Sequence, residues 1–129
     1  MLAAVAPDEA VWLGFEAVDP AEPANVRVRL DRPEPLDAVT GGQWDETLSE
    51  EPRNYLVCPP DSRLAGVRCE SGYMPFGARG DEQLSVLVAN GTSALVRVEL
   101  VSPSAFTDAT GVVPAPLDPD SGYKGWLLP

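Results

Sequence analysis

The sequence predicts an all-β fold. Fourteen prolines and eleven glycines occur among 129 residues, and proline both removes a helical hydrogen-bond donor and clashes with the preceding turn. Between turn-forming clusters lie short segments in which apolar residues recur with a period of two, and no amphipathic helical period stands out. These observations favour a two-layer antiparallel β-sandwich, jelly-roll or immunoglobulin-like, with a small β-barrel as the alternative.

Two neighbouring strands are predicted near the N-terminus, at residues 10–18 and 25–31. Residues 25–31 alternate apolar with polar side chains, which is typical of an antiparallel strand with one buried face and one wet face. Residues 10–18 have an apolar side chain at every second position and are interpreted as the neighbouring strand. The turn-rich residues 19–23 would connect them. The side chains expected to face the core are Val11, Leu13, Phe15, Ala17, Val26, Val28 and Leu30.

Residues 32–53 are predicted to form a long acidic surface loop, because prolines, a pair of glycines and clustered carboxylates interrupt every periodic pattern. A loop of this length is uncommon without a purpose. Shorter strands are expected at residues 54–58 and 64–69, on either side of a Pro-Pro-Asp turn, and another at residues 73–76.

The strongest local signal is a β-hairpin within residues 83–101, which an Asn-Gly pair divides into two β-rich runs. A two-residue loop would place Arg97 on the apolar face, which is costly if that face is buried. A three-residue loop at residues 89–91 instead pairs Val86 with Ala94 and keeps the face apolar, so we predict this loop. The apolar face then consists of Leu84, Val86, Val88, Val96, Val98 and Leu100.

After the hairpin the chain is expected to continue as an extended Pro-rich C-terminal segment, residues 102–129. The chain as a whole, residues 1–129, suits a single β-rich domain, since a chain of this length can bury most of its apolar surface in one core.

Twenty acidic and nine basic residues give a net charge of −11. Such a field repels nucleic acid and anionic membranes, so the expected partner is a protein or a second copy of the chain, with carbohydrate as an alternative. The sequence shows neither an export signal nor an apolar run long enough to span a membrane. We therefore expect a soluble protein, in the cytoplasm or in a virion-like assembly.

Histidine is absent, which removes the commonest general base, the commonest metal ligand and every histidine-activated nucleophile. Asp45 with Glu50 or Glu51 could serve as a glycosidase-type pair. A raised carboxyl pKa requires burial, however, and a solvated loop does not provide it. The sequence therefore indicates no catalytic residue, no metal site and no cofactor.

Cys58 and Cys69 each end a predicted strand. A disulfide between them is one alternative, if the strands are close neighbours. Two reduced, partly buried thiols are favoured, because disulfides persist mainly in exported proteins. Their spacing does not suit zinc.

Three short motif matches are interpreted as turns. Residues 79–81 read Arg-Gly-Asp, residues 90–92 match a glycosylation acceptor, and residues 118–122 resemble the start of a calcium loop that lacks its later carboxylates.

Trp44, Tyr123 and Trp126 are the candidate binding residues, since large flat side chains on loops commonly anchor binding surfaces. The alternative for the last of them is that the tail folds back and plugs one end of the sandwich. We favour a non-catalytic structural or protein-interaction module, such as a component of a phage capsid or tail. The alternatives are a carbohydrate-binding module that uses these aromatics and a small carboxylate-dependent hydrolase or isomerase.

Overall fold

The computed structural model describes residues 1–7, 9–78, 80–90 and 93–114. Strands dominate this part of the chain, one short helix accompanies them, and the described strands do not close into a barrel. The all-β class predicted from turn residues and alternating patterns is therefore confirmed.

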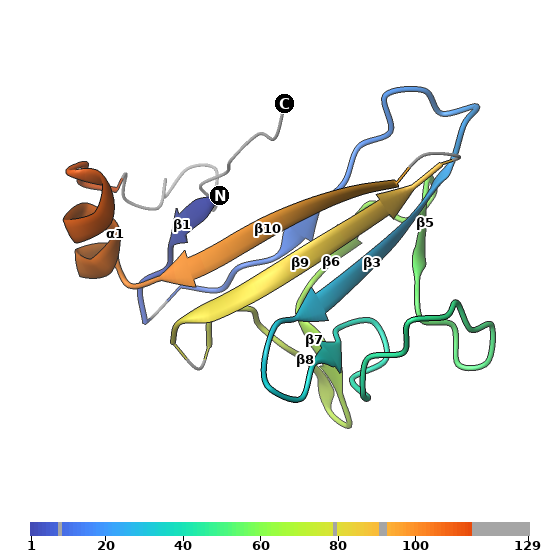
Figure 1. Cartoon of the computed structure of the whole chain (residues 1–129), viewed down its shortest axis with the longest axis horizontal. Coiled ribbons are helices and arrows are strands. Elements are labelled where there is room, and N and C mark those ends of the chain that lie inside the picture. Colours follow the sequence, from blue (N-terminus) through green and yellow to red (C-terminus); the bar gives the residue numbers. More distant parts are fainter. Residues whose placement is uncertain (8, 79, 91–92, 115–129) are drawn as a thin grey trace.

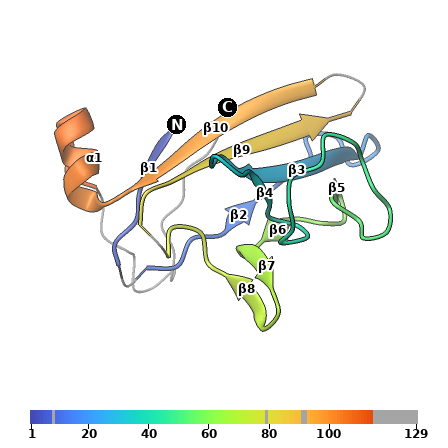
Figure 2. The same ribbon diagram turned by 60° about the horizontal axis from the view of Figure 1, so that its bottom comes forward.

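The main sheet has the strand order β1-β10-β9-β3-β4, and β5 also pairs with β3 (Figures 1 and 2). Its strands are β1 (Leu2–Ala4), β3 (Ala24–Leu30), β4 (Leu36–Asp37), β5 (Leu56–Cys58), β9 (Glu82–Ala89) and β10 (Ser93–Val101). β1 runs parallel to β10, whereas the other pairs of this sheet are antiparallel. The sheet is thus mixed, contrary to the antiparallel prediction, because β1 and β10 are not joined by a hairpin and nothing imposes opposite directions on them.

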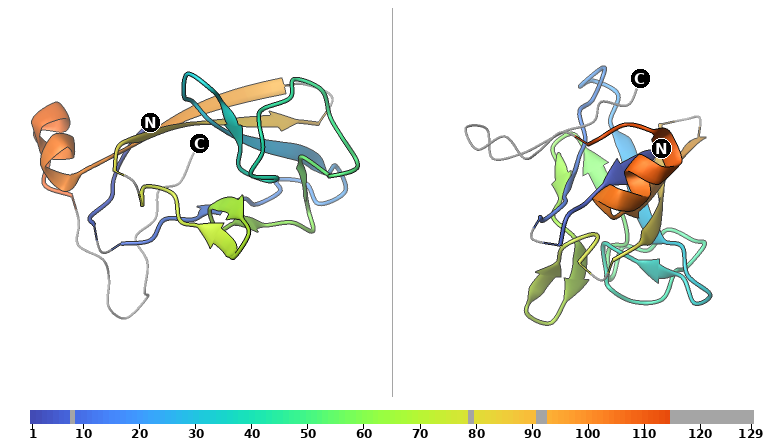
Figure 3. Two further views of the ribbon diagram at one scale, coloured as in Figure 1. Left: turned by 90° about the horizontal axis from the view of Figure 1, so that it is seen from below. Right: turned by 90° about the vertical axis from the view of Figure 1, so that its left-hand side faces the viewer.

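Two small ribbons lie against one face of the main sheet, as Figures 2 and 3 show. They are β2 (Leu13–Gly14) with β6 (Arg63–Leu64), and β7 (Val67–Cys69) with β8 (Gly72–Met74). Buried side chains of β3, β9 and β10 pack in one cluster with Leu64, Val67 and Phe76. Both layers therefore contribute to the main core.

The strand predicted at residues 64–69 is divided into β6 and β7 at Gly66. A Cβ on this glycine would lie 2.1 Å from the carbonyl oxygen of Met74. The close approach of the two backbone segments therefore requires glycine here, and it interrupts the strand.

Residues 10–18 keep the predicted alternation but not the predicted partner. The side chains expected to face inward pack against the core, whereas Trp12 is 46% exposed. The strand within this segment, β2, pairs with β6 rather than with β3. β3 already pairs with β9 along one edge and with β4 and β5 along the other, so neither edge of β3 is left for residues 10–18.

The β9–β10 hairpin has the predicted core face in a different register. Val86 pairs with Val96 rather than with Ala94, and the last pair before the turn is Ala89 with Ser93. Three residues separate this pair, as predicted, but they are residues 90–92, so the predicted position at residues 89–91 is wrong. The register differs from the predicted one by two residues, and such a shift leaves every side chain on its face, so alternation could not discriminate between the two. Leu84, Val86, Val98 and Leu100 are buried, and Val88 and Val96 pack against them.

The segment after β10 begins with a helix, α1 (Pro103–Thr110), and not with the extended chain predicted from residue 102 onward. The hydroxyl of Ser102 caps its N-terminus, Pro103 stands in the first turn, and Gly111 ends it at φ 73°. Phe106 packs on the ends of β1 and β10. No helix among the described residues is long and apolar enough to cross a membrane.

Candidate functional site

The main sheet has an outer face, which points away from the core and carries alternating polar side chains. In its central row, Arg29 of β3, Ser85 of β9 and Arg97 of β10 lie next to one another in register. Two residues further along β10, Glu99 pairs with Gln83 of β9 and is in register with Leu2 of β1. The β3 half and the β10 half of this face have different surroundings.

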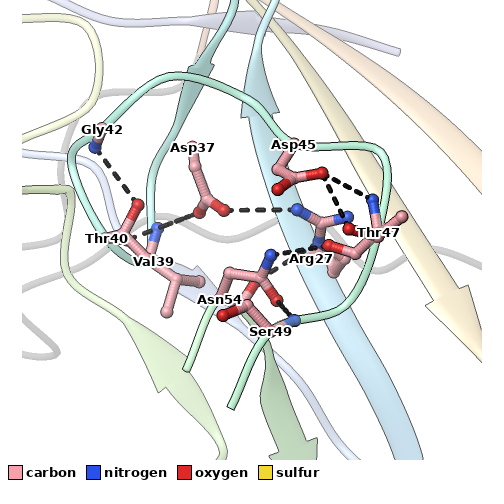
Figure 4. A network of polar contacts seen from close by, with 9 residues as sticks. All are labelled: Arg27, Asp37, Val39, Thr40, Gly42, Asp45, Thr47, Ser49 and Asn54. Atoms are coloured by element: carbon pink, nitrogen blue, oxygen red, sulfur yellow. Dashed lines mark hydrogen bonds and ion pairs between the residues drawn. The ribbon is translucent and has the colours of Figure 1, made fainter. Parts of the chain in front are cut away.

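The acidic loop folds back over the β3 half. Arg27 is only 6% exposed. Its Nη2 lies 3.3 Å from Oδ2 of Asp37, and its Nε donates to the backbone carbonyl of Asn54 (Figure 4). The outward face of β3, which the sequence predicts to be wet, is thus covered at this position, and the buried guanidinium is tolerated because it is paired.

The same network determines the path of the loop. The Oδ1 of Asp37 accepts hydrogen bonds from the backbone N–H groups of Val39 and Thr40. The side chain of Asn54 accepts from the N–H of Ser49 and donates to the carbonyl of Thr47 (Figure 4). Local side-chain bonds of this kind replace regular secondary structure, so residues at both ends of the loop attach it to β3.

Trp44, a candidate binding residue, contacts two cations of its own chain. The guanidinium carbon of Arg27 lies 3.7 Å from the centroid of the Trp44 ring, and that of Arg29 lies 5.3 Å from it. The indole is half-buried, and its Nε1 is buried without a hydrogen-bond partner in the described part of the chain. The other two candidates, Tyr123 and Trp126, lie outside the described residues.

Two carboxylates of the loop, Asp45 and Glu50, are exposed and form local hydrogen bonds. The backbone N–H and the hydroxyl of Thr47 both bond to Asp45 and hold the pKa of that carboxyl below its usual value. The hydroxyl of Tyr55 donates to Glu50, which raises the pKa of Tyr55. A general acid needs a raised carboxyl pKa. The pKa of Asp45 is shifted in the opposite direction, so this carboxyl does not match that role.

The two cysteines are free, with Cys58 buried and Cys69 exposed. They end β5 and β7, as predicted, but β5 pairs with β3 and β7 pairs with β8. The calcium-like turn at residues 118–122 and the first residue of the Arg-Gly-Asp motif lie outside the described residues.

The β10 half of the outer face is open. A depression of about 480 Å³ is lined by Arg29, Asp31 and Arg97 among other residues. Within it the Nε of Arg29 lies 2.7 Å from Oδ1 of Asp31, whose Oδ2 accepts a hydrogen bond from the buried Ser85. The charges of Arg29 and Asp31 therefore satisfy each other within the chain.

Among the described residues, the outer edge of β10 is paired only over its C-terminal part (Figure 1). β1 is in register with Glu99 and the two residues after it. The N–H of Glu99 donates to the carbonyl of Met1 at 2.8 Å, and the amino group of Met1 donates to the carbonyl of Arg97 at 2.8 Å. The odd-numbered residues of β10 therefore direct their backbone groups toward this edge.

Leu95 belongs to the same set, and it is the residue that sequence reasoning missed. Its backbone N–H and C=O have no hydrogen-bond partner among the residues that the structure describes. Its side chain is 51% exposed on the outer face. Leu95 thus marks an open edge of the main sheet.

Comparisons of the chain with known protein families, with curated proteins and with solved structures find no match.

Proposed function

We propose that the chain is a non-catalytic protein-interaction module that accepts an additional strand at the outer edge of β10. The observation that supports this proposal is the unpaired backbone at Leu95, whose hydrogen-bonding groups face away from β9. An extended segment of another chain can satisfy such groups by adding a strand to the sheet.

Apart from the charged Arg97 at its end, the open stretch of residues 93–97 lacks the usual protections against strand addition. Natural sheets protect their edges with proline, lysine, bulges or very short strands. Residues 93–97 contain neither proline nor lysine, and the pairing of β10 with β9 runs without a bulge from Ser93 to Leu100. A regular ladder of this length presents a geometry that an incoming strand can match.

The predicted sandwich forms part of the proposal. The main sheet would be one layer and the two ribbons the other, and the support is that both contribute to the core. An open edge on such a domain suits attachment to another subunit of a larger assembly, such as a capsid or tail. The carbohydrate-binding alternative has less support, since two guanidinium groups contact the Trp44 ring.

A photo-crosslinking side chain at position 97 tests the proposal in cells that make the protein. We expect defined protein adducts that Leu95→Pro abolishes and Leu95→Thr retains, because proline removes the outward N–H whereas threonine keeps it. A crosslinker at the exposed Tyr73 of β8 is the positional control. Adducts that survive Leu95→Pro, or that form equally from position 73, would overturn the proposal.

A further inference from the structure

We infer that the added strand is β10 of a second copy of this chain, running antiparallel, with Leu95 on the two-fold axis. The inference rests on the proposed function and identifies its partner. A two-fold contact uses the same surface on both copies, so the edge must be complementary to itself.

The position of the axis follows from where the open edge begins and ends. The pairing with β9 starts at Ser93, and the bond from Met1 to the carbonyl of Arg97 marks where the N-terminal segment begins to cover the edge. Residues 93–97 are centred on Leu95. A two-fold axis at this residue therefore uses the whole open stretch of both copies.

The hydrogen bonds suit the same arrangement. Leu95 of each copy would exchange both of its backbone bonds with Leu95 of the other, as in a hydrogen-bonded antiparallel pair. The outward N–H of Arg97 would donate to the carbonyl of Ser93 in the second copy. The carbonyl of Arg97 would keep its bond to Met1.

Side-chain charges disfavour registers with the axis shifted toward the C-terminal end of β10. Directly opposite like charges destabilise a pair of strands, and an axis at Arg97 would place two guanidinium groups opposite each other. An axis at Val96 would oppose Leu95 with Arg97. The axis at Leu95 opposes leucine with leucine and Arg97 with the neutral Ser93.

Both faces of the joined sheet gain apolar contact from this register. On the outer face Leu95 lies beside Leu87 of β9, so the two copies would form one continuous leucine cluster. On the core side, Ala94 would oppose Val96 of the second copy, and Val96 packs against the core. The apolar surfaces of the two copies would thus become continuous across the axis.

The association should depend on salt and concentration. Each copy carries a net charge of −11, and this repulsion is screened as ionic strength rises. A short strand pair buries less surface than a stable interface needs. Sedimentation equilibrium of the full chain should therefore show a dimer that grows with protein concentration and with added salt.

Variants at Leu95 test the contact. Leu95→Pro should raise the dissociation constant of the dimer by about tenfold or more, whereas Leu95→Thr, which keeps the outward N–H, should change it much less. Circular dichroism should show both variants folded, since the N–H of Leu95 does not bond to β9.

Cysteine substitution tests the register. In a Cys69→Ser background, Leu95→Cys should form a disulfide-linked dimer on mild oxidation, because paired α-carbons about 5.5 Å apart lie within disulfide range. Ala94→Cys is the matched control and should not crosslink, since it would face Val96 instead of itself. Crosslinking through position 96 or 97 rather than 95 would overturn the register.

A chain that stays monomeric at every concentration and salt would overturn self-pairing. So would protection of the Leu95 amide from hydrogen exchange that does not change with dilution, because it would indicate an occupant from within the same chain. If adducts from position 97 contain only other proteins, the proposed function stands and the inference fails. If no adduct depends on Leu95, the proposed function fails as well.

Discussion

The main sheet ends in two different ways. At the β3 edge, β4 and β5 pair with the strand, and the acidic loop covers its outer face through the buried Arg27–Asp37 pair. At the β10 edge, β1 covers three residues and Leu95 keeps unpaired backbone groups in the described part of the chain.

The difference shows what closing an edge requires. Covering the outer face of β3 removes the Arg27–Asp37 pair from water. The desolvation cost of such a pair is offset only by good geometry and additional hydrogen bonds to its polar atoms. Asp37 of the loop and the adjacent Asn54 supply partners for Nη2 and Nε of Arg27. Nothing comparable is built over Leu95, so the comparison predicts that substitutions on the two sides have very different effects on stability.

The largest effect is expected from Arg27→Ala. The substitution leaves the carboxylate of Asp37 buried without its cation, and breaking a buried pair on one side costs about 3 to 5 kcal/mol. Urea unfolding followed by circular dichroism measures this loss. Arg97→Ala, at the open edge, is the control and should stay within about 0.5 kcal/mol of the unsubstituted chain. Equal losses would show that the two edges do not differ as described.

A smaller loss is expected from Gly41→Ala, in the turn that follows β4. Gly41 has φ +78°, and a Cβ there would lie 2.2 Å from the backbone oxygen of Arg68. We expect a loss of about 2 to 4 kcal/mol in thermal or urea unfolding. The adjacent Gly42→Ala is a matched control, because its Cβ would meet only the Thr40 hydroxyl at 3.6 Å. A similar loss in both variants would argue against a tight turn under this edge.

Two substitutions of Trp44 separate the contributions of packing and of hydrogen bonding to the stability of the covered edge. Trp44→Ala removes the ring over Arg27 and should cost about 2 kcal/mol, from lost apolar area and the cation–π contact. Trp44→Phe keeps a ring and removes a buried N–H that has no partner among the described residues, so it should cost less than about 1 kcal/mol. A larger loss for Trp44→Phe, measured by urea unfolding, would mean that the indole N–H has a partner.

The alternation of apolar and polar residues predicted correctly which side chains share a face of a strand, but it did not predict which strands pair with each other. Val26, Val28 and Leu30 are buried as expected, because a period of two determines which side chains share a face. The pairing of β2 with β6 depends on which edges of β3 are already taken, and that is a property of the whole fold. A register shift of two residues in the hairpin likewise changes no face.

Other errors had signals in the sequence. Ser102, Pro103 and Gly111 are ordinary helix-boundary residues, but a helix of eight residues shows no clear apolar stripe. Arg27 could not be recognised as buried from the sequence, because an arginine alternates with apolar residues in the same way whether its side chain is paired and buried or exposed to water. The run of residues 93–96, without charge or proline, is the signal that could have indicated an unprotected edge, but alternation alone did not bring it out.

The smallest effect expected is a pH dependence at the β5 side of the covered edge. The phenol of Tyr55 donates to Glu50, and this bond raises the pKa of Tyr55 above its usual value of 10.0. The folded chain therefore holds this proton more tightly than the unfolded chain does, and stability falls as the pH rises from the unfolded pKa through the folded one. Near-ultraviolet absorbance titration, with Tyr55→Phe to identify the signal, should place Tyr55 above a free tyrosine. Glu50→Gln should lower that pKa, since its largest cause is the bond to Glu50; an unchanged titration would mean that the loop does not hold Glu50 against Tyr55 in solution.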